Sequence, residues 1–138
     1  MKQALSVASE CAPLVKTGGL ADVAGALPGA MAGQGWAVRT LIPGYPAVLA
    51  AVKKPKVVLK APSFYGGPVR VLAGSAAGLD LLVLDAPHLF ERDGTPYLDS
   101  NGNDWPDNPQ RFAALSNMAA RLAVDGVGNW RPDVVHGH

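Results

Sequence analysis

The chain has 138 residues, of which 49% are hydrophobic and 17% are charged. That length suits one ordinary domain, because compact domains cluster near about 100–150 residues. The apolar content excludes the disordered, fibrous and coiled-coil classes. Twelve basic and eleven acidic side chains give a net charge of +1. Charge alone therefore cannot hold nucleic acid or an anionic membrane, and we expect neither as a partner.

The cysteine count and the amino terminus indicate a cellular compartment. Cys11 is the single cysteine, so the chain can form neither an internal disulfide nor a cysteine-based zinc site. Glu10 interrupts the apolar stretch at the amino terminus, far short of the roughly 18 residues of a membrane span. We expect a soluble, cytoplasmic protein.

The first part of the chain predicts a β-α-β unit. Ala4–Ala8 is a short apolar run that is typical of a buried parallel strand. A helix is expected from Gly19 or just after it, and Pro28 within it predicts a kink or a restart. Trp36–Ile42 predicts the second strand, closed by a PGYP turn. The helix is predicted from apolar residues at three- and four-residue spacing, namely Val23, Ala24, Leu27, Ala30 and Met31.

The next segments predict further strands. Val57–Lys60 and Val69–Leu72 are short β-like runs around the sequence FYGGP, which indicates a hairpin or meander at an edge of the sheet. Leu79–Leu84 predicts another buried strand, and the final RPDVVHGH predicts a last short one. These elements favour an α/β fold with a mostly parallel sheet. Since no helix follows the last strand, we expect the chain to be a piece of a longer protein.

A long polar segment precedes the second predicted helix. Asp85–Asn108 is rich in Gly, Pro, Asp and Asn, and it is far longer than a typical connection of about 4–6 residues. We interpret it as a functional loop. Pro109 then opens a helix that ends near Gly126, since proline is favoured in a first helical turn. Its apolar face comprises Phe112, Leu115, Met118, Ala119 and Leu122.

The sequence ECAPLVKTGGLADV lies between the first predicted strand and the first helix. Ligands of open α/β sheets bind beyond the carboxyl ends of strands, where a helix start offers free backbone N–H groups. Gly18 and Gly19 would let a phosphate approach those groups, and Lys16 would add a positive charge. Neither GxxxxGK[ST] nor GxGxxG spacing is present. The alternative is a simple tight turn beside a solvated lysine.

Three further polar residues have local explanations. Asp22 falls in the first turn of the predicted helix, where the helix dipole favours a carboxylate by about 0.3–1 kcal/mol. His136 and His138 alternate along the last strand and so share a face. An H-x-H pair can bind a metal, but the sequence shows no third ligand, and we expect no metal site. We place His138 in the wall of a cleft instead.

The run from Glu10 to Pro28, ECAPLVKTGGLADVAGALP, resembles the amino-terminal signature of the bacterial glycogen synthase and plant starch synthase family. The likeness continues through LDAPHLFERDGTPYLD, DNPQRFA and RPDVVHGH, so it covers nearly the whole chain. The resemblance implies a retaining glucosyltransferase of the GT-B fold. It predicts a Rossmann-like three-layer α/β/α domain, residues 1–138, as the amino-terminal half of such an enzyme. The second GT-B domain is absent from this sequence.

The resemblance also implies roles for single residues. Lys16 matches the family's lysine on the phosphates of ADP-glucose, and Gly18 and Gly19 match the glycines beside the same diphosphate. Glu10 and Tyr97 match positions that line the sugar and acceptor side of the cleft. We therefore predict Lys16 and Glu10 as catalytic, and Lys16, the two glycines, Tyr97 and His138 as substrate-binding. Glu10 could instead only cap a strand, and Tyr97 could only pack the long loop.

The function implied is transfer of glucose from ADP-glucose to the non-reducing end of an α-1,4-glucan, with retained configuration and no cofactor. In the family, the segment matching DVVHGH continues into an aspartate and a tryptophan, and this sequence ends before both. The missing carboxy-terminal domain is thus an expected partner, and the chain alone is expected to be inactive. A non-catalytic nucleotide- or phosphate-binding regulatory module and a purely structural domain are the alternatives.

Overall fold

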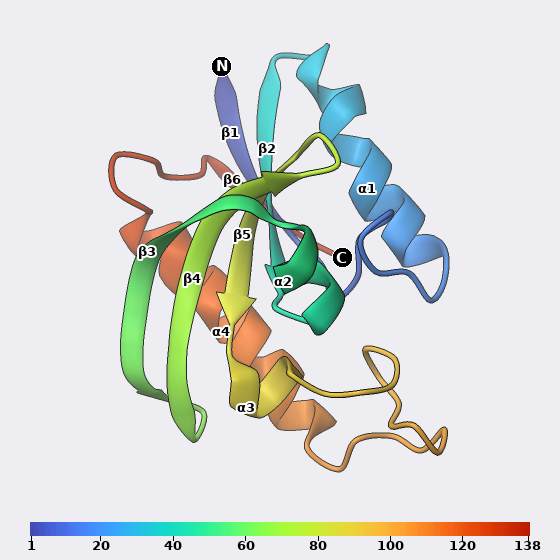
Figure 1. Cartoon of the computed structure of the whole chain (residues 1–138). Helices are drawn as coiled ribbons and strands as arrows, with labels where there is room; N and C mark the ends of the chain where they lie inside the picture. Colours follow the sequence, from blue (N-terminus) through green and yellow to red (C-terminus); the bar gives the residue numbers. More distant parts are fainter.

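The computed structural model describes all residues, 1–138, and contains one six-stranded sheet in the order β3-β4-β5-β2-β1-β6 (Figure 1). The strands are β1 Lys2–Val7, β2 Trp36–Pro43, β3 Lys53–Phe64, β4 Gly67–Ala76, β5 Leu79–Asp85 and β6 Val134–Gly137. The helices are α1 Gly19–Ala32, α2 Pro46–Ala51, α3 Pro87–Phe90 and α4 Asn108–Asp125. None of the helices combines the length and the apolar character needed to cross a bilayer.

The predicted α/β architecture is confirmed. Strand β1 pairs in parallel with both β2 and β6, and β2 pairs in parallel with β5. Leu27 of α1 lines a groove together with Ala4 of β1, whereas Leu115 of α4 lines a cavity together with Val7. Because an even and an odd position of one strand point to opposite faces, α1 and α4 cover opposite faces of the sheet. The result is a three-layer arrangement (Figure 1).

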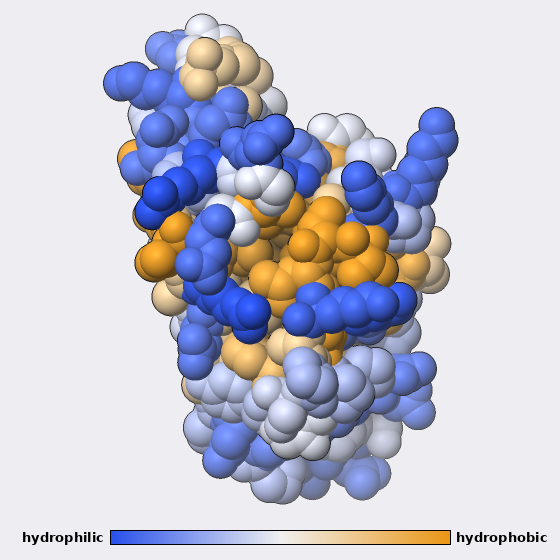
Figure 2. Space-filling view, turned by 90° about the vertical axis from the view of Figure 1, so that its left-hand side faces the viewer, coloured by the Kyte–Doolittle hydropathy of each residue, from blue (hydrophilic) through white to orange (hydrophobic).

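The predicted edge hairpin is also present, and it is longer than expected. β3 and β4 pair antiparallel, and Tyr65 and Gly66 between them have φ values of 53° and 92°. Two positive φ angles are typical of the type I′ turns that match strand twist. The sequence KKPK begins β3 and is exposed. Because it contains no apolar run, the sequence did not predict the start of this strand. Figure 2 shows hydrophilic side chains beside an apolar patch on one face. Exposed lysines on an edge strand hinder pairing with other chains.

Two local features differ from the simplest expectation. Helix α1 continues through Pro28, which excludes a restart there. The PGYP segment does not only turn the chain, because Pro46 is the first residue of α2. Proline is favoured at that position, since the first N–H of a helix has no partner within the helix. The same rule explains Pro87 in α3 and Pro109 in α4.

Gly25 brings α1 close to the loop that follows β1. A Cβ atom built on Gly25 would lie 2.2 Å from the backbone oxygen of Ala12, whereas one on Gly29 of the same helix would meet nothing within 4 Å. We expect Gly25→Ala to lower the free energy of unfolding by about 1–3 kcal/mol, because backbone must move.

The matched substitution Gly29→Ala should stabilise the chain by about 0.5–1 kcal/mol through helix propensity alone. Urea unfolding of the two variants measures both effects. Equal stability of the two would contradict the close approach at Gly25.

Candidate functional site

The order in which the chain adds strands to the sheet reverses at β1. From β1 the chain proceeds to β2 on one side, while β6 lies on the other side. In open α/β sheets such a switch point leaves a crevice beyond the carboxyl ends of the strands. A cavity of about 250 Å³ lies there. Its lining joins the ends of β1 and β6 to the long loop and α4, through Val7, Ala8, Ser9, Tyr97, Phe112, Leu115, Ser116, Gly137 and His138.

Glu10 lies just after β1 and is buried, with 1% of its surface exposed. Its carboxylate accepts hydrogen bonds from the Thr17 hydroxyl, from the Gly18 N–H at 3.1 Å and from the Tyr97 hydroxyl at 2.9 Å. Burial alone would raise the pKa of Glu10, but these hydrogen bonds lower it below its ordinary value. Glu10 therefore stays ionised at neutral pH and connects the glycine turn to the long loop.

The two glycines of the motif differ in what they offer. Gly18 precedes α1 and donates its N–H to Glu10. Gly19 is the exposed first residue of α1, and its N–H makes no hydrogen bond within the protein. A Cβ on Gly19 would meet nothing within 4 Å. The Gly19 amide is thus free for an anion at this helix start, while Gly18 shapes the turn.

Lys16 points at the first turn of α1. Its Nζ atom lies 2.8 Å from both carboxylate oxygens of Asp22, and both side chains are about half exposed. Asp22 is in the first helical turn, as predicted. Exposed ion pairs of this kind contribute only about 0–1 kcal/mol, so little free energy holds Lys16 to Asp22.

Tyr97 comes from the long loop and reaches back to the end of β1. Besides Glu10, its hydroxyl lies 2.6 Å from the Ser9 Oγ, and its ring packs 5.7 Å from that of Phe112. Burial raises the pKa of Tyr97, and the bond to Glu10 and its charge add to this, while the bond with Ser9 opposes it. The Tyr45 hydroxyl donates to the Ser9 carbonyl at 2.7 Å, so the end of β1 is held from two sides.

The two C-terminal histidines share a face, as predicted. The rings of His136 and His138 stack with centroids 4.2 Å apart, and His138 Nε2 lies 3.0 Å from the Ser6 Oγ. Burial and the neighbouring His136 lower the pKa of His138, which favours a neutral ring. No group of three or more His, Cys, Asp or Glu side chains lies close enough together to hold a metal ion.

The structure brings Glu10, Gly18 and Tyr97 into one hydrogen-bonded set. Of these three residues only Tyr97 lines the cavity, together with His138. It adds two residues that the sequence did not single out, Thr17 and Ser9. Both flank predicted residues in the chain. Their hydroxyls could have been suspected only once Glu10 was known to turn inward.

Comparison with known proteins identifies the family of the chain. Residues 3–138 match the family model described as "Starch synthase catalytic domain". The chain belongs to this family. The match covers nearly every residue, including the Glu10–Asp22 motif, the long loop and β6. The resemblance noted in the sequence is thereby confirmed.

Several relatives are bacterial proteins called glycogen synthase. The chain is 60% identical over 138 residues to the one from Paracoccus denitrificans, covering 100% of this chain and 30% of that protein. It is 59% identical over 135 residues to "Glycogen synthase 1" of Rhizobium meliloti, covering 97% of this chain and 28% of the relative. The chain thus spans less than a third of the length of these relatives.

A solved structure shares the fold. The catalytic domain of starch synthase IV from Arabidopsis thaliana, bound to ADP and acarbose, matches with a TM-score of 0.75 and 25% identity. The match covers 99% of this chain and 28% of that one. This match confirms the predicted Rossmann-like α/β fold, the amino-terminal half of a GT-B glycosyltransferase.

Proposed function

We propose that this chain is the amino-terminal, acceptor-side part of a glycogen synthase that transfers glucose from ADP-glucose to the non-reducing end of an α-1,4-glucan. The observation that carries the proposal is the buried carboxylate of Glu10, which contacts the glycine turn through Gly18 and the long loop through Tyr97. A donor site and an acceptor site must meet at one point for transfer, and Glu10 links the two segments that would form them.

The donor side would use the start of α1. When the bond between glucose and the diphosphate breaks, the sugar becomes oxocarbenium-like and negative charge grows on the leaving phosphate. Lys16, released from Asp22, and the free N–H of Gly19 would face that charge. Donors fixed in place before reaction stabilise the transition state more than the ground state.

The acceptor side would use the cavity beside β1 and β6. Because Glu10 is ionised at neutral pH, it supplies negative charge near the sugar rather than a proton. It also holds the Tyr97 hydroxyl in one orientation. His138 would line the wall with a neutral ring. Transfer with retention needs no protein nucleophile from this chain if the acceptor attacks on the face that the diphosphate leaves.

The remaining part of the enzyme would complete the site. The family relatives are more than three times as long as the chain. We propose that their carboxy-terminal domain supplies the pocket for the nucleoside and further groups for the diphosphate. No resident cofactor is part of this proposal, and we place the enzyme in the cytoplasm.

A direct test compares the full-length protein with residues 1–138. We expect the full-length protein to transfer labelled glucose from ADP-glucose to glycogen, and the 138-residue chain to show no measurable transfer. One charge-assisted hydrogen bond and a helix start contribute about 1.5–3 and up to about 2 kcal/mol. Millimolar binding needs roughly 4 kcal/mol, so the lone chain binds ADP-glucose weakly.

UDP-glucose in place of ADP-glucose tests the donor base. If the full-length protein binds ADP but transfers no glucose from either donor, the proposed transferase activity is contradicted. That result would support a nucleotide-binding regulatory module. Transfer by the 138-residue chain itself would show that the carboxy-terminal part is dispensable.

A further inference from the structure

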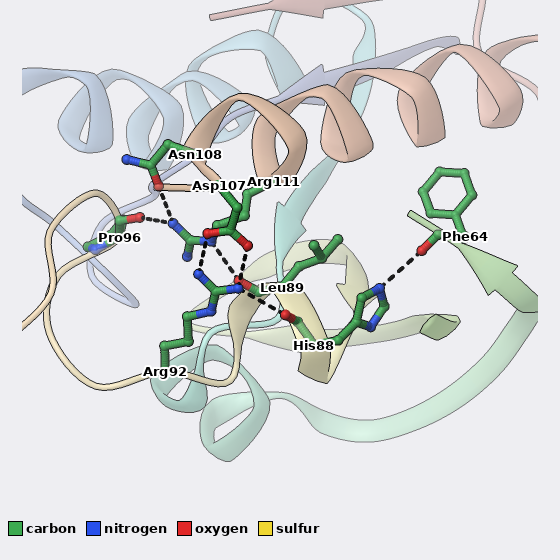
Figure 3. A network of polar contacts seen from close by, with 8 residues as sticks. All are labelled: Phe64, His88, Leu89, Arg92, Pro96, Asp107, Asn108 and Arg111. Atoms are coloured by element: carbon green, nitrogen blue, oxygen red, sulfur yellow. Dashed lines mark hydrogen bonds and ion pairs between the residues drawn. The ribbon is translucent and has the colours of Figure 1, made fainter. Parts of the chain in front are cut away.

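The long loop between α3 and α4 is held to the body of the protein by two arginines (Figure 3). Arg92, near the start of the loop, forms two 2.6 Å bonds with the carboxylate of Asp107 at its end. Arg92 also donates to the His88 carbonyl at 2.9 Å. This ion pair closes the loop at its base, but it makes no contact with Tyr97.

Arg111, in the first turns of α4, acts at a different place. It is 1% exposed, and no carboxylate pairs with it. Its Nε donates to the Leu89 carbonyl at 2.6 Å, and its Nη1 donates to the Pro96 carbonyl at 3.0 Å. The guanidinium lies 5.3 Å from the centroid of the Phe90 ring. A buried charge normally requires compensation. Here it comes from backbone carbonyl oxygens, that of Leu89 in α3 and that of Pro96 in the loop.

Asn108 binds both Arg111 and the next carbonyl of the loop, that of Tyr97. Its Oδ1 accepts from Arg111 Nη1 at 2.8 Å, and its Nδ2 donates to the Tyr97 carbonyl at 2.9 Å. Arg111 and Asn108, which are hydrogen-bonded to each other, thus bind the consecutive carbonyls of Pro96 and Tyr97. Figure 3 shows the bonds of Arg111 to Pro96 and to Asn108. Fixing the carbonyls on both sides of the Tyr97 Cα restricts rotation of its backbone.

We infer that Arg111 and Asn108 are positioning residues, which fix the Tyr97 backbone so that the Tyr97 hydroxyl meets Glu10 and Ser9. Neither Arg111 nor Asn108 touches the hydroxyl itself. The planar guanidinium suits this task because it presents several donors in fixed directions, which a lysine ammonium does not. The consequence for acceptor binding rests on the proposed function, whereas the placement of Tyr97 does not.

The test follows the ionisation of Tyr97 in the 138-residue chain by NMR with ring-labelled tyrosine. The chain has three tyrosines, and Tyr97→Phe identifies the signal. In the wild type we expect Tyr97 to titrate above the ordinary value of about 10, because it is partly buried and lies beside the charge of Glu10. In Arg111→Met and in Asn108→Leu we expect the midpoint to fall toward the ordinary value.

Matched controls separate positioning from a general loss of stability. Arg70→Met removes an arginine that pairs with Asp85. Asn117→Leu removes an amide from the same helix as Asn108, and this amide donates to the Tyr65 hydroxyl. Both should leave the Tyr97 titration at the wild-type midpoint. Should Arg111→Met fail to fold, Asn108→Leu decides.

A wild-type midpoint in folded Asn108→Leu would overturn the inference. So would an equal fall of the midpoint in the control Asn117→Leu. Neither result depends on sugar transfer, so failure of this inference is distinguishable from failure of the proposed function.

Discussion

Glu10→Ala is expected to lower the free energy of unfolding by about 3–5 kcal/mol. The substitution removes the acceptor of Thr17, Gly18 and Tyr97 in a site where Glu10 is 1% exposed. A buried donor without an acceptor costs about 1–3 kcal/mol, and the three donors to Glu10 all lose the carboxylate that accepts from them. Typical domains have only about 5–15 kcal/mol in total. Urea unfolding at pH 7 measures the difference.

Glu10→Gln is the matched control, because it keeps the size and removes the charge. Its carbonyl oxygen can accept from the Gly18 N–H, and its amide can donate to the hydroxyls of Thr17 and Tyr97. We therefore expect a loss of about 1–2 kcal/mol at pH 7, in the range of one charge-assisted hydrogen bond. Equal stability of Glu10→Ala and the wild type would show that the contacts of Glu10 do not hold the site together.

The difference in the free energy of unfolding between the wild type and Glu10→Gln should depend on pH. The folded-state pKa of Glu10 lies below its ordinary value of 4.5. Below that value the unfolded chain therefore binds more protons than the folded chain. The stabilisation by Glu10 is complete above pH 4.5 and disappears as the pH falls through the folded-state pKa. The stability difference between the wild type and Glu10→Gln should thus be constant from pH 6 to 8 and shrink on acidification.

The sequence predicted the parts of the fold that depend on local patterns. The β1-α1-β2 unit, the hairpin around Tyr65 and α4 each follow from apolar spacing with a turn or cap residue at the end. It did not predict α2, because six residues with only one of them buried carry too little pattern. The start of β3 was missed for a related reason, since its exposed lysines show no alternation.

The site was predictable as a set of residues but not as a network. The motif placed Lys16, Glu10 and the glycines at the first strand-to-helix turn, and the resemblance added Tyr97. Which N–H groups stay free depends on whether the carboxylate of Glu10 turns inward, and that is decided by contacts across 87 positions of sequence. Arg111 could not be predicted for the same reason, because its bonds to the backbone carbonyls of Leu89 and Pro96 leave no pattern in side-chain types.

In the full-length protein, Lys16→Ala is expected to lower kcat for transfer from ADP-glucose by about 100–1,000-fold. That range is typical for loss of one fixed donor that faces charge developing in a transition state. Lys16 is about half exposed and pairs only with Asp22, so its removal leaves no buried group unpaired. The free energy of unfolding should therefore change by less than about 1 kcal/mol. Steady-state kinetics with varied ADP-glucose and urea unfolding measure the two effects.

Two further variants show whether the effect comes from the position of the charge. Lys60→Ala removes an equally positive, exposed side chain on β3 and should leave kcat unchanged. Asp22→Asn keeps Lys16 but frees it from its ion pair, so ADP should bind as tightly as to the wild type or more tightly. If Lys16→Ala retained wild-type kcat, the lysine would be a solvated surface charge. The negative charge of the departing diphosphate would then need its counter-charge from another part of the enzyme.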